Sequence, residues 1–307
     1  MKFLLKGPLR KQMRDVLGAA EAEYVKLATK SFKPFMGASV NPPAIQELRD
    51  KGYHVTPNVF SADDLTSINS HLAGRELKWH GPQTWGVAPL EGVPVGAISG
   101  VYDQATVLSC PAFVKCVQNP SYVRLMSEYL GAPATISSAT AWWSFPDIAG
   151  DAGHQLYHHD RGDFRSCNLF VYLTDVDEMN GPHRYVLASH EMSHLLEWAQ
   201  RFDAAGQSQF FNWIEQHRKK DEHLLAFFTP ERIVTFLGPA GTSFFEDTRG
   251  LHKGTALRSG RRLAFEICYT VLPKYSEPFQ PLARQDLGVS AEGLYALTRY
   301  ATRLIYT

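Results

Sequence analysis

The apolar residues in the first part of the chain recur at the spacing of helices. This spacing runs through residues 13–31, and the prolines that follow end the pattern. A short strand is predicted at 52–55. It leads into a helix that begins after Ser61, because Ser61 and Asp64 have the spacing of a capping box. A further helix is predicted at 120–130, where the apolar stripe ends at a glycine.

From about residue 134 the pattern changes to short apolar runs separated by turn residues. Strands are predicted at 136–145, 155–160, 167–174, 233–237, 242–246 and 262–272. Helical spacing returns between about 191 and 228, in a segment rich in aromatic side chains. Helices first, then many short strands with one helical insertion, predict an antiparallel barrel or jelly roll with helices packed outside.

The composition is that of an ordinary globular protein with no preference for charged partners. The 307 residues are 44% hydrophobic, 20% charged and 12% aromatic, which argues against disorder and suits one large β domain. The 31 basic residues balance the 31 acidic ones. A neutral chain has no cationic excess for nucleic acid or anionic lipid, so we expect a small molecule as its partner.

The cysteines and the apolar runs bear on the cellular compartment. Cys110, Cys116, Cys167 and Cys268 form no CxxC pair and are too few for a disulfide scaffold, which predicts reduced thiols. We expect no signal peptide, because lysine and arginine interrupt the apolar residues near the N-terminus. No apolar run reaches the roughly 20 residues of a membrane span. These features predict a cytoplasmic protein without a membrane partner.

The strand predicted at 155–160 carries a candidate metal site. On an extended strand alternate side chains share a face, so His158 and Asp160 point the same way and His159 points the opposite way. A third ligand must come from a neighbouring strand, and the candidate is His252. Two histidines and one carboxylate on one triangular face are the arrangement of non-haem Fe(II) oxygenases. In these the open positions accept an oxo-acid cosubstrate and O2.

An arginine follows this candidate site at the start of the last predicted strand. A dicarboxylate cosubstrate that chelates the metal at one end needs a cation for its distal carboxylate, and a guanidinium suits that task better than an ammonium. Arg262 lies ten residues past His252, so a tight hairpin would bring it alongside the metal. Arg261 is the rival, because a slip of one residue in register exchanges the two faces of a strand.

These residues occur in a longer pattern that resembles the phytanoyl-CoA dioxygenase family of Fe(II)- and 2-oxoglutarate-dependent oxygenases. The pattern covers residues 52–270, and the His-x-Asp motif alone would not carry it. Ala188 stands where the family usually has glycine, a departure with no obvious chemical cost. The matching residues are His158 and Asp160, the segment Asn-Gly-Pro-His-Arg-Tyr-Val-Leu-Ala-Ser-His at 180–190, His252 and Arg262.

The resemblance implies a mainly β fold, a double-stranded β-helix of the jelly-roll or cupin-like kind with flanking N-terminal helices and a helical insertion. One oxygenase domain would span 1–307. Its parts would be an N-terminal helical extension at 1–50, a core at 52–270 that holds the insertion at about 191–228, and a C-terminal extension at 271–307. The resemblance also implies that His158, Asp160 and His252 bind Fe(II) and that Arg262 binds the distal carboxylate of 2-oxoglutarate. Thr255 is a weaker candidate for that carboxylate.

The reaction expected from this resemblance is an oxidation by O2. It is the hydroxylation, or another oxidation, of a C–H bond in a small molecule, with release of succinate and CO2. No catalytic residue beyond the metal ligands is expected. Family halogenases lack the carboxylate ligand, so Asp160 disfavours halogenation. The sequence does not indicate the substrate, the oligomeric state, or the choice among hydroxylation, desaturation and cyclisation.

Some alternatives stay open at this point. The same fold also serves metal enzymes that do not use 2-oxoglutarate, and non-catalytic binding proteins that keep a structural metal. The insertion at about 191–228 fits either a lid that closes over substrate or plain helical packing. The Trp142-Trp143 pair and Phe145 fit either a substrate pocket or the core.

Overall fold

The computed structural model describes residues 39, 41–57, 59–146, 155–160, 165–272, 282 and 292–306. The helix expected at 13–31 lies outside these residues, as does about half of the extension at 271–307. Among the described residues, no helix combines the length and the apolar character needed to cross a membrane.

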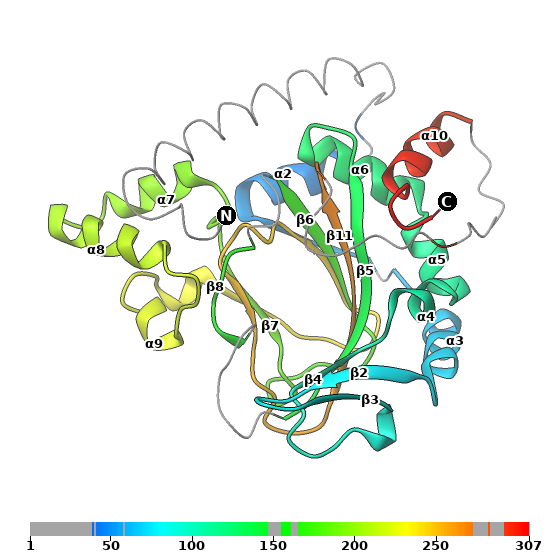
Figure 1. The fold of residues 1–307 in the computed structure, drawn as a ribbon. Helices are drawn as coiled ribbons and strands as arrows, with labels where there is room; N and C mark the ends of the chain where they lie inside the picture. The colour runs from blue at the N-terminus through cyan, green and yellow to red at the C-terminus, as the bar shows by residue number, and fades with distance from the viewer. Residues whose placement is uncertain are drawn as a thin grey trace.

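The centre of the molecule is a large antiparallel sheet that faces a smaller one (Figure 1). The smaller sheet has three strands in the order β10 (His252–Gly254), β7 (His183–Val186) and β8 (Ile233–Phe236). The larger sheet has eight strands, in the order β1 (Tyr53–Thr56), β9 (Ser243–Glu246), β6 (Ser166–Tyr172), β11 (Arg262–Thr270), β5 (Thr135–Ser144), β4 (Ser99–Val101), β2 (Glu76–His80) and β3 (Trp85–Pro89). Together the sheets form the jelly-roll, cupin-like core that the sequence predicts.

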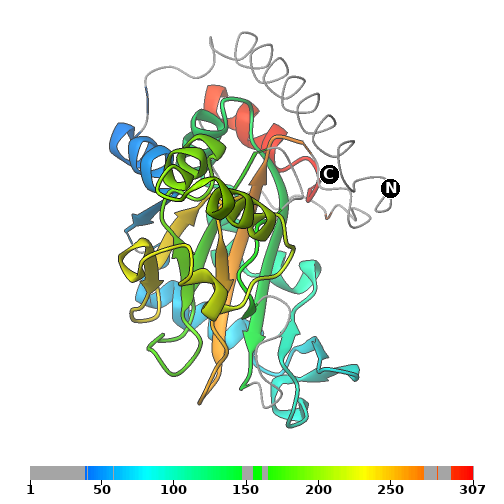
Figure 2. The ribbon, with the colours of Figure 1, turned by 90° about the vertical axis from the view of Figure 1, so that its left-hand side faces the viewer.

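The long strands β5 and β11 run side by side (Figure 2). One face of β11 packs in the main apolar core, and the other face lines a cavity. Leu263, Phe265 and Ile267 of β11 are fully buried in the main apolar core. Arg262 and Glu266 alternate with these residues along the strand, so they face the other way and line a cavity. Because side chains alternate along a strand, one strand supplies both the apolar core and the polar site.

Helices cover the apolar face of the larger sheet. Phe113 stacks on Phe265, with ring centroids 4.4 Å apart, and Val117 and Met126 are fully buried in the same cluster. The helices are α2 (Pro42–Lys51), α3 (Ala62–Leu72), α4 (Gln104–Leu108), α5 (Pro111–Val117), α6 (Pro120–Leu130) and α10 (Glu292–Ala301), with short 3-10 helices at Leu90–Gly92 and Pro230–Arg232.

Two helices begin and end where local chemistry predicts. Ser61 and Asp64 form the predicted capping box of α3, in which the Ser61 hydroxyl accepts from the Asp64 amide at 3.1 Å and Asp64 accepts from the Ser61 amide at 3.0 Å. The α6 helix spans the predicted residues 120–130 and ends at Gly131, whose φ of 74° is left-handed. Both predictions are confirmed.

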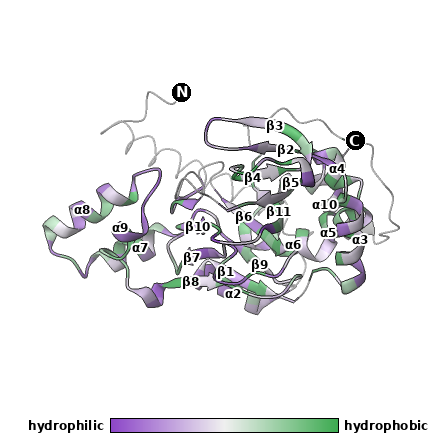
Figure 3. Ribbon diagram, turned by 90° about the horizontal axis from the view of Figure 1, so that it is seen from below, coloured by the Kyte–Doolittle hydropathy of each residue, from purple (hydrophilic) through white to green (hydrophobic). Residues whose placement is uncertain are grey.

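The predicted insertion is helical and lies at one end of the molecule, away from α3, α5 and α6 (Figure 3). It consists of α7 (Met192–Ala199), α8 (Ala204–Ile214) and α9 (Asp221–Leu224). Trp198, Phe210 and Phe228 of this segment are buried in an apolar cluster that also includes Tyr157, Val186 and Leu251 from outside it. The insertion therefore has a packed interior that is distinct from the main core.

Some predicted strands differ from the structure. Residues 155–160 form no strand, and only Tyr157 and His158 make isolated bridges, to Lys219 and to His252. The sequence also gave no indication of β2, β3, β4, β7 or β10. β2 and β3 alternate between more and less exposed residues, but each is only five residues long and largely exposed, so neither stands out from the surrounding loops in the sequence.

Candidate metal centre

Two histidines that are far apart in the sequence are paired through their backbones. The His158 amide donates to the His252 carbonyl at 3.0 Å, and the His252 amide donates to the His158 carbonyl at 3.0 Å. Residues that face each other in an antiparallel pair point to the same side. The rings consequently lie together in the interior, with centroids 4.2 Å apart, and each residue is only 4% exposed.

The orientation of both rings is set by main-chain carbonyls. His158 Nδ1 lies 2.9 Å from the Leu156 carbonyl oxygen, and His252 Nδ1 lies 2.9 Å from the Gly250 carbonyl oxygen. A carbonyl only accepts hydrogen bonds, so each Nδ1 carries the proton and each Nε2 presents its lone pair. Neutral imidazoles held in this tautomer are suited to bind a metal ion.

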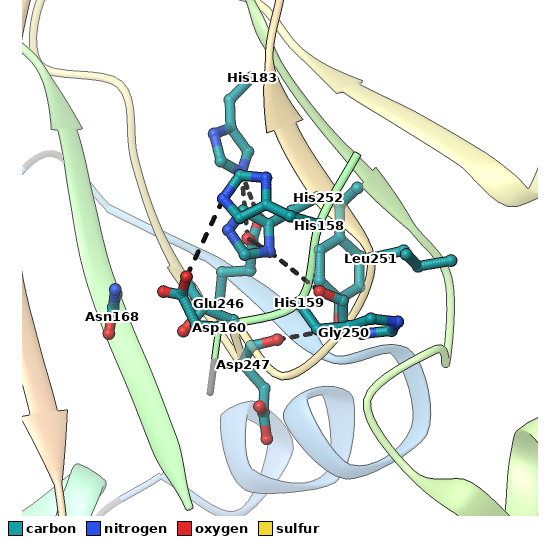
Figure 4. Close-up of polar contacts among 12 residues, drawn as sticks. His158, His159, Asp160, Asn168, His183, Glu246, Asp247, Gly250, Leu251 and His252 are labelled. Atoms are coloured by element: carbon teal, nitrogen blue, oxygen red, sulfur yellow. Dashed lines mark hydrogen bonds and ion pairs between the residues drawn. The ribbon is translucent and has the colours of Figure 1, made fainter. Parts of the chain in front are cut away.

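Asp160 completes a set of three ligand atoms (Figure 4). Asp160 Oδ1 lies 3.9 Å from His158 Nε2, and the ligand atoms of His158, Asp160 and His252 all lie within 4.8 Å of one another. The Asp160 amide donates to the Thr248 carbonyl at 2.8 Å, which holds this residue beside the loop that precedes His252. His159 turns the other way, and its Nδ1 bonds the Arg249 carbonyl at 2.6 Å. The structure thus brings the three predicted ligands together.

The three side chains open into a cavity of about 490 Å³ between the two sheets. Its wall combines apolar and aromatic side chains with a few polar groups, as is typical of small-molecule sites. Besides the three candidate ligands, the lining residues include Ile98, Val101, Thr140, Trp142, Phe170, His183, Thr255, Leu257, Arg262 and Glu266.

Arg262 lines this cavity, whereas Arg261 does not. Arg262 is 6% exposed; it donates to the Gly181 carbonyl and, at 3.2 Å, to the Ser144 hydroxyl. Burial lowers the pKa of its guanidinium. The side chain of Arg261 is 47% exposed and lies 3.4 Å from Glu91. The prediction of a tight hairpin between His252 and Arg262 is wrong. β10 and β11 belong to different sheets, and Arg262 reaches the cavity from the sheet opposite His252.

Thr255 and Arg262 present buried polar atoms with unmet hydrogen-bonding capacity. The Thr255 hydroxyl and the Arg262 Nε have no hydrogen-bond partner among the described residues. Both residues line the cavity, and a Cβ added at Gly254, the residue before Thr255, would lie 3.5 Å from Arg262 Nη2. Buried donors normally have partners, so these atoms fit an acceptor such as a carboxylate that enters the cavity.

The segment at 180–190 supports this site from two sides. The Gly181 carbonyl accepts from Arg262, and the Ser189 hydroxyl accepts from the Leu251 amide at 2.7 Å, next to His252. Ala188 has a left-handed φ of 56°. The departure from glycine therefore carries a conformational cost that was not apparent from the sequence, because an L side chain is strained in that conformation.

A second buried pair beside the three ligands was missed from the sequence. His183 lines the cavity, its ring lies 5.6 Å from that of His252 at an angle of 18°, and its Nε2 lies 2.9 Å from Glu246 Oε2. Burial lowers the pKa of His183 to about 3 and raises the pKa of Glu246 to about 8. The pair is therefore neutral near pH 7. A glutamate at the end of an otherwise apolar strand was the available signal.

The adjacent tryptophans of β5 lie on opposite faces of the sheet. Trp142 lines the cavity. Trp143 is buried in the main core, where its Nε1 donates to the Tyr102 hydroxyl at 3.2 Å, and Phe145 packs against the same core. Of these three aromatic residues, only Trp142 is placed to touch a bound molecule.

Comparison with solved structures finds similar folds at low sequence identity. SnoK, a non-haem α-ketoglutarate-dependent carbocyclase from nogalamycin biosynthesis, is 18% identical, covering 75% of this chain and 83% of that chain with a TM-score of 0.50. EctD from S. alaskensis with bound Fe is 16% identical, covering 88% of each chain with a TM-score of 0.50. No model of a known family matches this chain, and no curated protein does. At such identities the similarity establishes the fold alone.

Proposed function

We propose that this protein is a non-haem Fe(II)- and 2-oxoglutarate-dependent oxygenase. It oxidises a C–H bond of a small molecule with O2 and releases succinate and CO2. The observation that carries the proposal is the convergence of His158, Asp160 and His252 in one cavity, together with the unmet hydrogen-bond capacity of Arg262 and Thr255. A metal site and a carboxylate site in one cavity are what a chelating dicarboxylate requires.

Each residue has a defined task in this proposal. The Nε2 atoms of His158 and His252 and the carboxylate of Asp160 hold Fe(II), and the backbone carbonyls at Leu156 and Gly250 keep both rings in the ligating tautomer. Arg262 and Thr255 bind the distal carboxylate of 2-oxoglutarate and so orient its oxo-acid end toward the three ligands. When bound, Fe(II) activates O2 while 2-oxoglutarate supplies two electrons as it becomes succinate and CO2.

The rest of the cavity receives the substrate. Apolar side chains (Ile98, Val101 and Trp142) line it together with polar groups, as in other small-molecule sites. The fold is shared with SnoK, described as an α-ketoglutarate-dependent carbocyclase, and with EctD, crystallised with Fe. Hydroxylation is the simplest outcome, and ring formation or desaturation needs no different set of protein groups.

We further assign the chain to the phytanoyl-CoA dioxygenase family. The motif segment at 180–190 supports this assignment, because Gly181 and Ser189 contact Arg262 and the residue before His252. We expect a cytoplasmic protein with a small-molecule substrate, in keeping with four buried free cysteines.

The main alternative is a metal enzyme of the same fold that does not use 2-oxoglutarate. Such an enzyme has no need of a buried arginine and a buried hydroxyl that await an acceptor in the metal cavity, so Arg262 and Thr255 favour the 2-oxoglutarate proposal. A non-catalytic binding protein is disfavoured by the ligand triad, which leaves positions open at the metal.

An anaerobic titration tests the proposal. Fe(II) and 2-oxoglutarate are added to the apo-protein, and the weak visible charge-transfer band of the chelate is recorded. We expect a band in the wild type, no band in His252→Ala or Asp160→Ala, and a band that needs more 2-oxoglutarate in Arg262→Ala. Iron that binds without any band on addition of 2-oxoglutarate would move the assignment to the cosubstrate-independent metal enzyme.

A further inference from the structure

The residues next to the two candidate histidine ligands are buried on the opposite side, against the helical insertion. His158 and His252 point into the cavity, so their neighbours Tyr157 and Lys253 point away from it. Tyr157 and Lys253 are each 1% exposed, and the Lys253 Nζ lies 5.3 Å from the centroid of the Tyr157 ring. A nearly fully buried lysine is rare in proteins and needs a specific partner.

One short segment of the insertion contacts both of these neighbours. The backbones of Tyr157 and Lys219 exchange two hydrogen bonds, each of 2.9 Å. Two residues later, Asp221 Oδ1 lies 2.5 Å from Lys253 Nζ, and Asp221 Oδ2 lies 3.8 Å from Arg184 Nη1. Arg184 is the partner of Lys253 across the β7–β10 pair. Residues 219–221 thus join the segment that carries His158 to the strand that carries His252.

We propose that residues 219–221 form a brace that positions the metal ligands, and that the insertion affects metal affinity through it. This inference rests on the metal site of the proposed function. Among the described residues the brace bonds Tyr157, Lys253 and Arg184, and these three do not line the cavity. Its members are therefore positioning residues that act through Tyr157 and Lys253. Ligand atoms must be held within about 0.5 Å of their productive positions. The His158–His252 backbone pair has only two hydrogen bonds, and the brace adds an independent constraint to each side of it.

The brace also decides between the two interpretations of the insertion. A lid must move away from the site, and its attachments are expected to be few and exposed. The backbone attachment between Tyr157 and Lys219 is nearly fully buried, as is Lys253, although its partner Asp221 has a side chain that is 43% exposed. Around the brace the insertion is therefore a fixed support of the metal site.

Co(II) binding measures the effect of the brace without turnover. The variants are Asp221→Asn, which removes one charge, and the double variant Asp221→Asn with Lys253→Met, which leaves no unpaired buried charge. We expect the Co(II) dissociation constant to rise about 10-fold or more, as for other partners that orient metal ligands. The visible d–d bands of Co(II) should also change. The double variant should keep the circular dichroism and thermal midpoint of the wild-type apo-protein, whereas Asp221→Asn alone should lower the midpoint because Lys253 stays charged and buried.

Two controls separate positioning from a general structural effect. Glu222→Gln removes a charge from the position next to Asp221. The Glu222 side chain is 69% exposed and lies 4.0 Å from Lys220 Nζ and 3.7 Å from His223 Nε2, so this variant should bind Co(II) with wild-type affinity. Asp221→Glu restores the carboxylate and should bring the dissociation constant back to within about threefold of the wild type. Folded Asp221→Asn and double variants with wild-type affinity and bands would overturn the brace. A wild type that binds no Co(II) would instead overturn the metal site itself.

Hydrogen exchange in the wild type gives a second test that does not depend on a variant folding. Coupling between two sites is reciprocal. If the brace strengthens metal binding, bound metal must in turn stabilise the brace against local opening. Saturating Co(II) should therefore slow exchange at the Tyr157 and Lys219 amides, which form the backbone bridge. Slower exchange around His252 with no change at Lys219 would show that the insertion is uncoupled from the metal.

Discussion

His158 and His252 are hydrogen-bonded to each other through both of their backbones, so each histidine sets the position of the other. Their rings lie with centroids 4.2 Å apart, and both Nδ1 atoms are engaged by carbonyls from their own segments. The backbone pair thus places both rings as two ligands of one metal require. Pre-organisation of this kind reduces the cost of ordering ligands upon binding.

Replacing Arg262 should weaken 2-oxoglutarate binding much more than replacing Arg261. A hydrogen bond to a charged group contributes about 1.5–3 kcal/mol, so Arg262→Ala should raise the concentration of 2-oxoglutarate needed for half-saturation by roughly 10- to 100-fold. Arg261 is the matched control, since it is adjacent in sequence but exposed beside Glu91. Equal effects of the two substitutions in an anaerobic titration would contradict the assignment.

Thr255→Val should lower the affinity for 2-oxoglutarate without lowering the stability of the apo-protein. The Thr255 hydroxyl is buried with no partner among the described residues, so a methyl group in its place removes no hydrogen bond from the apo-protein. The lost bond to the cosubstrate corresponds to about 1 kcal/mol, or roughly a fivefold change in affinity. Thr255→Ser keeps the hydroxyl and should bind like the wild type. Wild-type binding by the valine variant would exclude Thr255 from the carboxylate site.

Ala188→Gly should stabilise the protein. The left-handed conformation costs an L residue roughly 1–2 kcal/mol, and the greater freedom of glycine in the unfolded chain offsets part of this gain. We expect a net gain of about 0.5–1 kcal/mol in urea unfolding. Ala205→Gly, in the exposed first turn of α8, should have the opposite sign because glycine disfavours a right-handed helix. A loss of stability in both variants would show that the strain at Ala188 is absent.

The predictions that succeeded from sequence depend on local geometry. Any extended segment alternates its side chains, so His158 and Asp160 share a side even though no regular strand forms at 155–160. The ends of α3 and α6 are likewise determined by the residues at Ser61 and Gly131.

The features that could not be predicted depend on pairing between distant segments. The position of Arg262 relative to His252 depends on which sheet each of their strands joins. The residues that lie between them in the sequence do not reveal this. The pairing of His183 with Glu246 has the same origin. Glu246 stands out at the end of its strand, but nothing in the sequence indicates that His183 is its partner, so only the fold identifies the pair.

The Asp247–Arg249 pair should make stability depend on pH in the acidic range. Asp247 is fully buried in the loop between β9 and β10, where it accepts from Arg249 Nη2 at 2.6 Å and from the Tyr129 hydroxyl at 2.6 Å. Burial alone raises the pKa of Asp247, but the charge and hydrogen bonds of Arg249 outweigh it, and the pKa is held below its ordinary value. A carboxyl with a depressed pKa stabilises the fold above its unfolded pKa of about 3.9. That stability is lost as the pH falls through the folded pKa.

Asp247→Asn should therefore cost about 3–5 kcal/mol at pH 7, because it leaves the charge of Arg249 without its buried partner. The difference between wild type and variant should begin to shrink below about pH 4, where the carboxyl of the unfolded wild-type chain becomes protonated. It should shrink further as the pH falls through the lower pKa of the folded carboxyl. Urea unfolding at pH 7, 5 and 3 measures both effects. Asp50→Asn, at an exposed position on α2, is the control and should leave stability nearly unchanged at all three pH values. A constant difference between wild type and Asp247→Asn across this range would mean that Asp247 is not the titrating group, and that Arg249 is stabilised by other contacts such as Glu191, at 3.1 Å.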